Sequence, residues 1–249
     1  MDKLINRKKT TDILSTNRRE HHHNLTKIVE PVMVFVEGGT FRMGCSSEQG
    51  NDARDNEKPL HTVTLSSYNI GIYPITQKQW QAIMGNNPSG FKGDNYPVEN
   101  VSWDDANEYI RCLNEATGKK YRLPTEAEWE FAARGGNKSQ GYKYCGGDIL
   151  SDVAWFKENS DEITHPVGAK KPNELGIYDM SGNVWEWCYD WFCAYQLSEQ
   201  SNPTGPASGS YRVYRGGSCY ASSAICRVSY RYGNIPGNSL CNLGFRVVL

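Results

Sequence analysis

The sequence predicts a single α+β domain that is rich in loops. Short runs of β-branched and aromatic residues within residues 32–65 are typical of β-strands. Three later stretches open with the polar pattern that caps α-helices, and no helix signal returns after residue 136. The 24 glycines and a mean hydropathy of −0.64 indicate many turns between these short elements.

The first predicted elements are strands. Residues 32–36 are β-branched, aromatic or otherwise apolar, and residues 41–44 follow a Gly-Gly turn, so the two segments are predicted to pair as a hairpin. Residues 45–59 are charged and rich in turn formers, which indicates a loop. Residues 61–65 alternate between polar and apolar side chains and predict a further strand.

Three helices are predicted from capping boxes, in which a Ser or Thr pairs with an acidic or amide side chain three residues later. The pairs are Thr76 with Gln79, Ser102 with Asp105, and Thr125 with Glu128. The second helix has an apolar stripe from Trp103 to Leu113 and ends at Gly118, because glycine favours the left-handed conformation of a helix C-cap. The first and third helices are expected to end near Met84 and Gly135.

Composition excludes several classes of partner. The formal net charge is −1 and the pI is about 6.5, so no basic field would attract nucleic acid. No run approaches the ~18 apolar residues that a membrane span needs, and we expect no membrane insertion. The N-terminus lacks an apolar signal segment, so no secretion signal is expected.

Residues 1–30 form a polar arm of mixed charge with few apolar residues. Such a segment cannot bury enough apolar surface to fold by itself, so we expect it to be disordered or to dock on another molecule. The folded domain is predicted to span residues 31–249.

Nothing in this predicted domain indicates acid–base or nucleophilic catalysis. His61 and His165 are its only histidines, and neither has a nucleophile or an acid at a recognisable spacing. No phosphate-binding loop, dinucleotide motif or hydrolase motif occurs. The eight cysteines are irregularly spaced and are expected to be reduced, although Cys219, Cys226 and Cys241 could supply the thiolates that Cu(I) prefers.

The segment of residues 179–186 has the composition of a calcium loop. The candidate ligands are Asp179, Gly182, Val184 and Glu186, which offer two carboxylates and main-chain carbonyls, the hard oxygen donors that Ca²⁺ takes. The neighbouring Val and Trp residues are predicted core, so Glu186 needs a partner, because an unpaired buried carboxylate is costly. The alternative is a tight turn in which Glu186 meets backbone donors or an arginine.

The last 31 residues, from Cys219 to Leu249, differ in composition from the rest of the chain. They contain no Lys, Glu, Gln, Met or Trp, although these types make up 49 of the 249 residues. What remains is rich in Tyr, Ser, Asn and Gly, as in binding loops, where Tyr supplies rigid contact area and small polar residues supply hydrogen bonds. The alternative is a terminal hairpin region that binds nothing, closed by a strand at residues 245–249.

Five motifs occur in an order that is typical of one family. They are residues 35–44, 122–130, 182–187, 215–218 and 242–246. Together they resemble the sulfatase-modifying-factor family, also called the formylglycine-generating-enzyme domain, over residues 31–249. The resemblance implies a C-type-lectin-like fold of class α+β, with short twisted antiparallel sheets, two or three helices and much irregular chain.

The resemblance also implies where the copper site of the family's oxidase would lie. That oxidase binds Cu(I) through two cysteines, and the matching positions here are Ala221 and Cys226. Alanine cannot replace a thiolate, and Cys219 is displaced by two residues, so neither a copper cofactor nor catalysis through Cys226 is expected. A copper-dependent formylglycine-generating oxidase, or a related modifier, is the alternative function.

The closing stretch resembles the variable region of proteins that retroelements diversify, whose randomised Asn codons never yield Lys, Glu, Gln, Met or Trp. The implied variable region is about residues 215–246. Its candidate ligand-binding positions are Tyr220, Ala221, Ser222, Ile225, Tyr232, Gly233, Asn234, Leu240 and Cys241. The intervening positions would be scaffold: Arg227, Arg231, Pro236, Asn242, Gly244 and Phe245.

This second resemblance implies a non-enzymatic binding protein with a diversified C-terminal face. Its expected partner is a protein or glycan on a cell surface. Because no secretion signal is expected, we expect the protein in a phage virion, as a tail receptor binder, or in the cytoplasm, with surface display only if another assembly carries it. Residues 1–30 would then attach it to a phage tail or to another copy of the chain.

Overall fold

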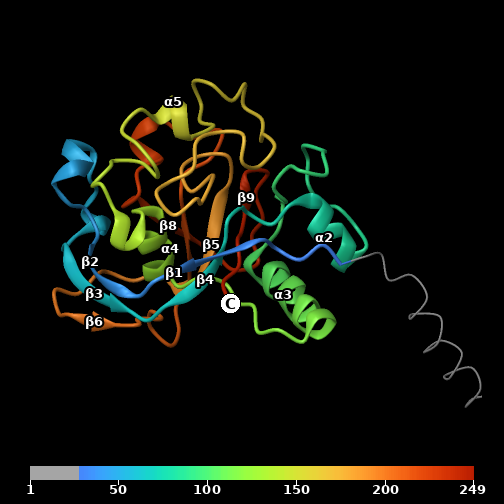
Figure 1. Ribbon diagram of the computed structural model, residues 1–249, viewed down its shortest axis with the longest axis horizontal. Helices are drawn as coiled ribbons and strands as arrows, with labels where there is room; N and C mark the ends of the chain where they lie inside the picture. The colour runs from blue at the N-terminus through green and yellow to red at the C-terminus, as the bar shows by residue number, and fades with distance from the viewer. Residues whose placement is uncertain (1–27) are drawn as a thin grey trace, which may run out of the picture.

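The computed structural model describes residues 28–249, so the predicted arm and its docking role lie almost entirely outside the described residues. Short sheets and a few helices surround an aromatic core, and long irregular segments connect them (Figure 1). This arrangement confirms the predicted α+β class. Within residues 28–249 no helix is both long and apolar enough to cross a membrane.

Three small sheets make up the β structure of the described residues. The first pairs two strands antiparallel: β1 (Met33–Val36) and β4 (Tyr68–Gly71). The second has the order β2-β3-β6: β2 (Gly39–Met43), β3 (His61–Leu65) and β6 (Gln200–Ser201). The third has the order β8-β7-β5-β9: β5 (Trp185–Trp191), β7 (Arg212–Arg215), β8 (Arg231–Asn234) and β9 (Leu243–Gly244). The third sheet carries the closing stretch of the chain.

The predicted hairpin of residues 32–44 is wrong, although both of its strands form. β1 pairs with β4 and β2 pairs with β3, so the two strands belong to different sheets. Gly38, between them, packs so closely on the chain after β3 that a Cβ would lie 2.5 Å from the carbonyl oxygen of Leu65. The segment therefore crosses from one sheet to the next instead of folding back on itself.

The three predicted helices are confirmed with their capping boxes. They are α2 (Gln77–Met84), α3 (Trp103–Thr117) and α4 (Glu126–Ala133). Gly118 ends α3 with a φ of 70°, as expected of a left-handed C-cap. The prediction that no helix follows α4 was wrong in one place, because the single-turn helix α5 (Leu150–Val153) forms. Four 3-10 segments also form: Ser47–Asp52, Asp55–Glu57, Gly136–Lys138 and Ser223–Ile225.

The last residues of the chain lie inside the core. The Phe245 ring packs edge-on at 6.2 Å from Trp80 and 5.5 Å from Tyr109, which stack on each other. The predicted strand at residues 245–249 is reduced to isolated bridges, in which Val248 faces both Ile70 and Arg122. The C-terminal segment therefore pairs with two distant parts of the chain and contributes side chains to the core of the domain.

Candidate functional site

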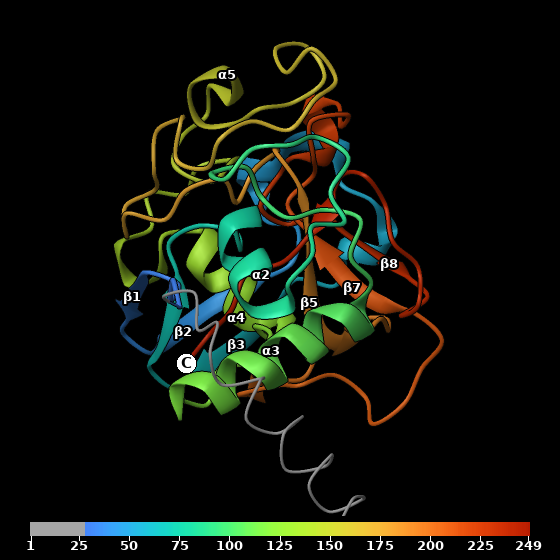
Figure 2. The same ribbon diagram turned by 90° about the vertical axis from the view of Figure 1, so that its right-hand side faces the viewer.

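The closing stretch wraps around the third sheet. β7 and β8 pair antiparallel, with Arg212 opposite Asn234 and Arg215 opposite Arg231. The short 3-10 segment η4 (Ser223–Ile225) lies between them in sequence, and β9 pairs parallel with the start of β5. In Figure 2, η4, β8 and the segment that leads to β9 lie on the right-hand side of the molecule. The candidate positions thus lie on β8, on the segment between β7 and β8, and on the segment that leads to β9.

A Gly-Gly turn fixes how the chain leaves β7. Gly216 and Gly217 have φ values of 99° and 75°, in the left-handed region that favours glycine. A Cβ on Gly217 would lie 2.7 Å from the sulfur of Cys226, and one on Gly216 would lie 3.1 Å from the Trp129 ring. Both conformation and space require glycine here, which gives the motif at residues 215–218 a structural reason.

Four arginines of this region are fully buried, and each pairs with a carboxylate from elsewhere in the chain. The pairs are Arg215 with Glu130, Arg227 with Glu57, Arg231 with Glu126, and Arg246 with Glu186. In the last three pairs the nitrogen–oxygen distance is 2.6 Å. The pairs connect the closing stretch to the 3-10 segment at residues 55–57, to α4 and to β5, so they hold its backbone from several sides.

Pairing with arginine lowers the pKa of two of these buried carboxylates, Glu126 and Glu57. Burial by itself would raise the pKa of Glu126, but the neighbouring Arg231 and Arg215 outweigh it and hold that pKa below its ordinary value. Burial acts on Glu57 in the same way, and the hydrogen bonds from Arg227 and Ser229 again hold the pKa below its ordinary value. Both pairs are therefore charged at neutral pH, and removing one partner would leave an uncompensated charge in the core.

The predicted candidate positions differ from these arginines in exposure. Eight of the nine are exposed or partly exposed, and Tyr232 has an exposed fraction of 46%. Ala221 is the exception, with an exposed fraction of 5%. Among the predicted scaffold positions, Gly244 and Phe245 are buried like the arginines. The division predicted from composition thus corresponds for most positions to a difference in accessibility; the exceptions are Ala221, which is buried, and the scaffold positions Pro236 and Asn242, which are partly exposed.

Contacts divide the candidate positions into two groups. Tyr220 and Cys241 meet where the tyrosine hydroxyl lies 4.0 Å from the cysteine sulfur. Tyr232, Gly233 and Asn234 form the second group along β8. Gly233 is confined, because a Cβ there would lie 3.0 Å from Phe192 and 3.1 Å from Tyr211. A larger residue at Gly233 would require those aromatic side chains to move.

The residues at the predicted copper position do not fit a copper ion. Ala221 and Cys226 lie in one apolar cluster with Tyr144 and Phe156, so the position is formed but offers a single thiol. Burial raises the pKa of the Cys226 thiol, which disfavours the thiolate that Cu(I) requires. All eight cysteines are free, and burial raises the pKa of Cys219 to about 12.

The predicted calcium loop forms a tight turn in which Glu186 is already paired. Both of its oxygens accept hydrogen bonds from Arg246, and one also accepts from the Trp129 indole at 2.7 Å. Asp179 accepts from the backbone of Gly168, and burial raises its pKa to about 6. Within residues 28–249 no three acidic, His or Cys side chains cluster as metal ligands do.

As placed, Asp179, Gly182, Val184 and Glu186 therefore do not fit a calcium ion, since the ion would have to displace the guanidinium. The arginine partner that the sequence left open as an alternative is present. Calcium binding by this loop stays a prediction that a binding measurement has to test.

No sequence motif points directly to the carboxylates that hold the arginines. Glu126 and Glu130 lie on α4, all eight residues of which are buried. A usable signal was the composition of α4, since acidic residues alternate there with Ala, Trp and Phe and no polar face remains.

Comparisons with known proteins agree with this geometry. The sulfatase-modifying factor enzyme 1-like domain matches residues 19–249. Chaperone protein LppX of Paenibacillus barcinonensis is 37% identical over 87% of this chain and 88% of its own length. The formylglycine-generating enzyme of Streptomyces coelicolor is 33% identical over 86% of this chain and 87% of its own length.

A solved structure extends the comparison. Treponema denticola variable protein 1 superposes with a TM-score of 0.81 at 34% identity, covering 91% of this chain and 97% of that protein. The C-type-lectin-like fold of the formylglycine-generating-enzyme type is confirmed, as is the predicted likeness to a variable protein. From its five motifs, its fold and these relatives, the chain belongs to the family of the sulfatase-modifying factor enzyme 1-like domain.

Proposed function

We propose that this protein is a non-enzymatic binding protein whose C-terminal face is diversified by a retroelement. The partner is a protein or glycan on a cell surface, and the contacts come from the nine candidate positions. Attachment to a phage tail, or to another copy of the chain, through residues 1–30 is part of the same proposal. The likeness to Treponema denticola variable protein 1 supports it.

One observation carries the proposal. Accessible positions of a restricted composition alternate with buried arginines that are locked to distant carboxylates. Surface substitutions away from special features usually change stability by less than ~0.5 kcal/mol, whereas the loss of one partner of a buried ion pair costs about 3–5 kcal/mol. A scaffold built this way tolerates change at accessible positions far better than at the buried arginines.

The first test is a pair of matched libraries. One library uses codons derived from AAC at the seven candidate positions that are accessible and not confined by neighbours: Tyr220, Ser222, Ile225, Tyr232, Asn234, Leu240 and Cys241. The other randomises the scaffold positions Arg227, Arg231, Pro236, Asn242, Gly244 and Phe245. We expect most clones of the first library and few of the second to resist proteolysis when displayed. Equal resistance in the two libraries would contradict the proposal.

The second test is genetic. The DNA around the gene is sequenced and searched for a near-repeat of the codons for residues 215–246 that differs mainly at adenines. Such a template is expected from a diversifying retroelement. A locus without it would leave a lectin-like domain with a fixed face.

A copper-dependent oxidase is the second candidate, because a related protein is named a formylglycine-generating enzyme. The substitution Ala221→Cys places a second thiol in the apolar cluster that holds Cys226. We expect the unchanged protein to bind no stoichiometric Cu(I) and the variant to gain binding that Cys226→Ala removes. Tight one-to-one binding by the unchanged protein, lost on Cys226→Ala, would favour the oxidase.

A further inference from the structure

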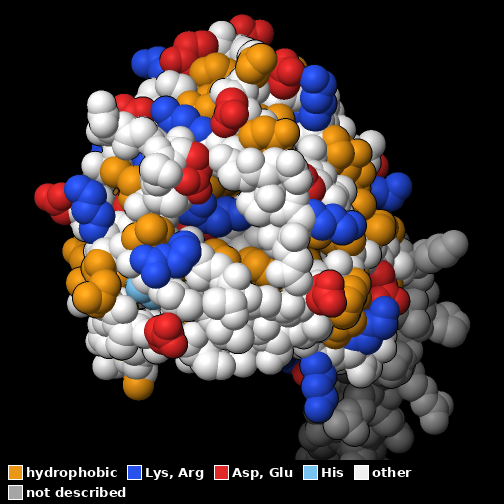
Figure 3. Space-filling model, turned by 60° about the vertical axis from the view of Figure 1, so that its left-hand side comes forward, with side chains coloured by type: hydrophobic (Ala, Val, Ile, Leu, Met, Phe, Trp, Pro, Cys, Tyr) orange, Lys and Arg blue, Asp and Glu red, His pale blue; other side chains and the backbone are white. Residues whose placement is uncertain are grey.

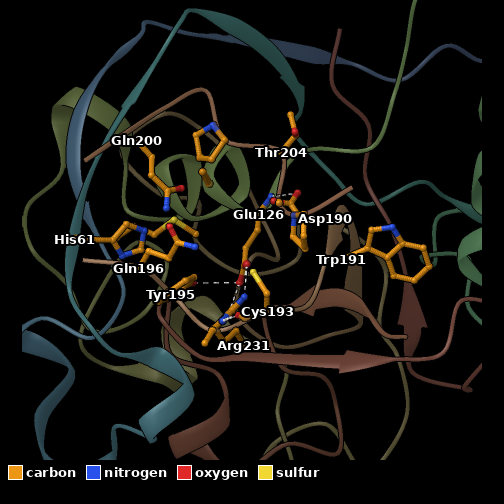
Figure 4. A pocket seen from close by; sticks show the side chains of 16 residues that line it. His61, Glu126, Asp190, Trp191, Cys193, Tyr195, Gln196, Gln200, Thr204 and Arg231 are labelled. Carbon is orange, nitrogen blue, oxygen red and sulfur yellow. Dashed lines mark hydrogen bonds and ion pairs between the residues drawn. The ribbon is translucent and has the colours of Figure 1, made fainter. Parts of the chain in front are cut away.

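A second candidate site lies in a cavity that contains none of the nine candidate ligand-binding positions. A cavity of about 380 Å³ opens between the start of β3, the N-terminus of α4, the end of β5 and the segment at residues 191–206 (Figure 4). This volume is at the small end of the ~300–1,000 Å³ range of small-molecule sites. On the side of the molecule that carries β2, β3 and β6, acidic and basic side chains are scattered without a large patch of either sign (Figure 3).

The arginine in this cavity already has a carboxylate partner. Arg231 uses four of its five N–H donors, on both oxygens of Glu126 and on the backbone carbonyls of Asn56 and Cys193. Glu126 also accepts from the Tyr195 hydroxyl at 3.2 Å. The charge of Arg231 is therefore balanced by Glu126, so the pair presents no net charge to a bound molecule.

Asp190 is different, because only half of its carboxylate is used. Its side chain is 5% exposed, and Oδ2 accepts from the backbone N–H of Glu126 at 2.8 Å. Oδ1 receives no hydrogen bond from the described residues, and it is not among their fully enclosed polar atoms, so it faces the cavity. Gly205 lies over the carboxylate so closely that a Cβ there would be 3.0 Å from the Cβ of Asp190.

The rest of the lining also favours a hydrogen-bond donor as ligand. The Nδ1 of His61 donates to the carbonyl of Pro59, which leaves Nε2 as an acceptor when the ring is neutral. Figure 4 shows His61 beside Gln196 and Gln200, across the cavity from Asp190, while the Trp191 ring points away. The cavity thus combines one unpaired acid with further acceptors and no unpaired cation.

We propose that this cavity binds a small primary alkylammonium ligand, with the ammonium on Asp190 and a hydrogen-bonding group at its other end near Gln196 and Gln200. An ammonium has three donors and a compact positive charge, which matches a half-used buried carboxylate. This inference does not depend on the binding function proposed for the C-terminal face of residues 215–246.

The proposal predicts a pH dependence of binding. Burial, with Glu126 nearby, raises the pKa of Asp190 to about 7, and the hydrogen bond from the Glu126 amide and the charge of Arg231 oppose this rise. The carboxylate must ionise to pair with the ligand, so affinity rises with pH. The charged and titratable groups around Asp190 are Glu126, Glu128, Arg122, Arg231, Arg212, Cys188 and Cys193, and His61 and Tyr195 line the same cavity. Arg122 pairs with Glu128, and Arg212 lies between Trp103 and Trp191, so neither replaces the ligand.

The test uses the whole chain, 4-amino-1-butanol as the probe and 1,4-butanediol as its uncharged match. Binding is followed by NMR through the backbone amides of Asp190, Thr204 and Gly205. We expect the amine to bind about tenfold more tightly at pH 8 than at pH 6, and the diol to bind weakly at both. Equal binding of amine and diol, or no binding of the amine at pH 8, would overturn the proposal.

A substitution separates the carboxylate from its surroundings. Asp190→Asn keeps an oxygen for the Glu126 amide and removes the charge, and we expect affinity for the amine to fall at least tenfold and to lose its pH dependence. Asp152→Asn, on an exposed carboxylate outside the cavity, is the matched control and should change nothing. An unchanged affinity in Asp190→Asn would refute the proposal, and if that variant does not fold, the pH profile of the unchanged protein decides.

Discussion

Within residues 215–246, buried arginines and accessible side chains alternate, and the comparison between them explains the region. Arg227 is fully buried and donates to Glu57, Ser229 and two backbone carbonyls. Tyr232 lies one residue beyond another such arginine and is 46% exposed. Buried arginines thus stabilise the segment, while different, accessible side chains form its surface. The accessible side chains can therefore change while the arginine pairs are kept.

The largest expected effect is the loss of a buried arginine. Arg227→Ala leaves Glu57 in the core with its charge uncompensated, and we expect a loss of about 3–5 kcal/mol in the free energy of unfolding by urea titration. Arg111→Ala is the control, because that arginine pairs with Glu108 and Glu115 on an exposed face and should cost at most ~1 kcal/mol. Equal losses in the two variants would show that burial does not set the strength of these pairs.

The next effect contrasts a paired carboxylate with an unpaired one. The pKa of Asp190 is about 7 in the fold, above its unfolded value of ~3.9, so its contribution to stability is full below pH ~4 and is lost as pH rises through 7. Asp190→Asn should remove a decline of about 2–3 kcal/mol between pH 5 and pH 8. The pKa of Glu57 is lowered, so its contribution is lost in the opposite direction, as pH falls below its unfolded value of ~4.3. Urea titrations at several pH values check both signs.

A smaller effect is expected from the Gly-Gly turn. Gly217→Ala forces a side chain into a left-handed conformation, with its Cβ 2.7 Å from the Cys226 sulfur, and should cost about 1–3 kcal/mol. Gly237→Ala is a matched control, because that glycine has open space around it and no positive φ. Thermal unfolding of the two variants measures the difference, and similar melting temperatures would mean that the turn is not fixed by Gly217.

The smallest effect is expected at an accessible candidate position. Tyr232→Ala should lower the free energy of unfolding by only about 0.5–1.5 kcal/mol, because the side chain is half exposed and loses only its ring contact with Tyr214. A loss above ~2 kcal/mol would place Tyr232 with the scaffold and break the comparison. The same urea titration as for Arg227→Ala is used, so the two values are directly comparable.

Local signals explain what the sequence could predict. The three capping boxes lie within four residues each, and all three helices begin where those boxes are. The exposure of most candidate positions also followed from composition, since the types present are those that tolerate water and contact. Their role in binding stays a prediction.

Long-range pairing explains what the sequence could not predict. Arg227 and Glu57 are 170 residues apart, and no sequence pattern in either segment predicts that the two side chains pair. The hairpin prediction failed for the same reason, because β1 and β2 each pair with strands that come later in the chain. Ala221 was misplaced because its burial comes from Tyr144 and Phe156, which approach it only in the folded molecule.

The position of Arg246 near the C-terminus has a consequence for any population of sequence variants. A premature stop or frameshift within residues 215–246 deletes this arginine and the Phe245 ring, leaving Glu186 and a cavity in the core. Such a truncated product cannot close its fold and is exposed to proteolysis. A chain truncated within this segment therefore loses its fold together with the surface that the segment carries.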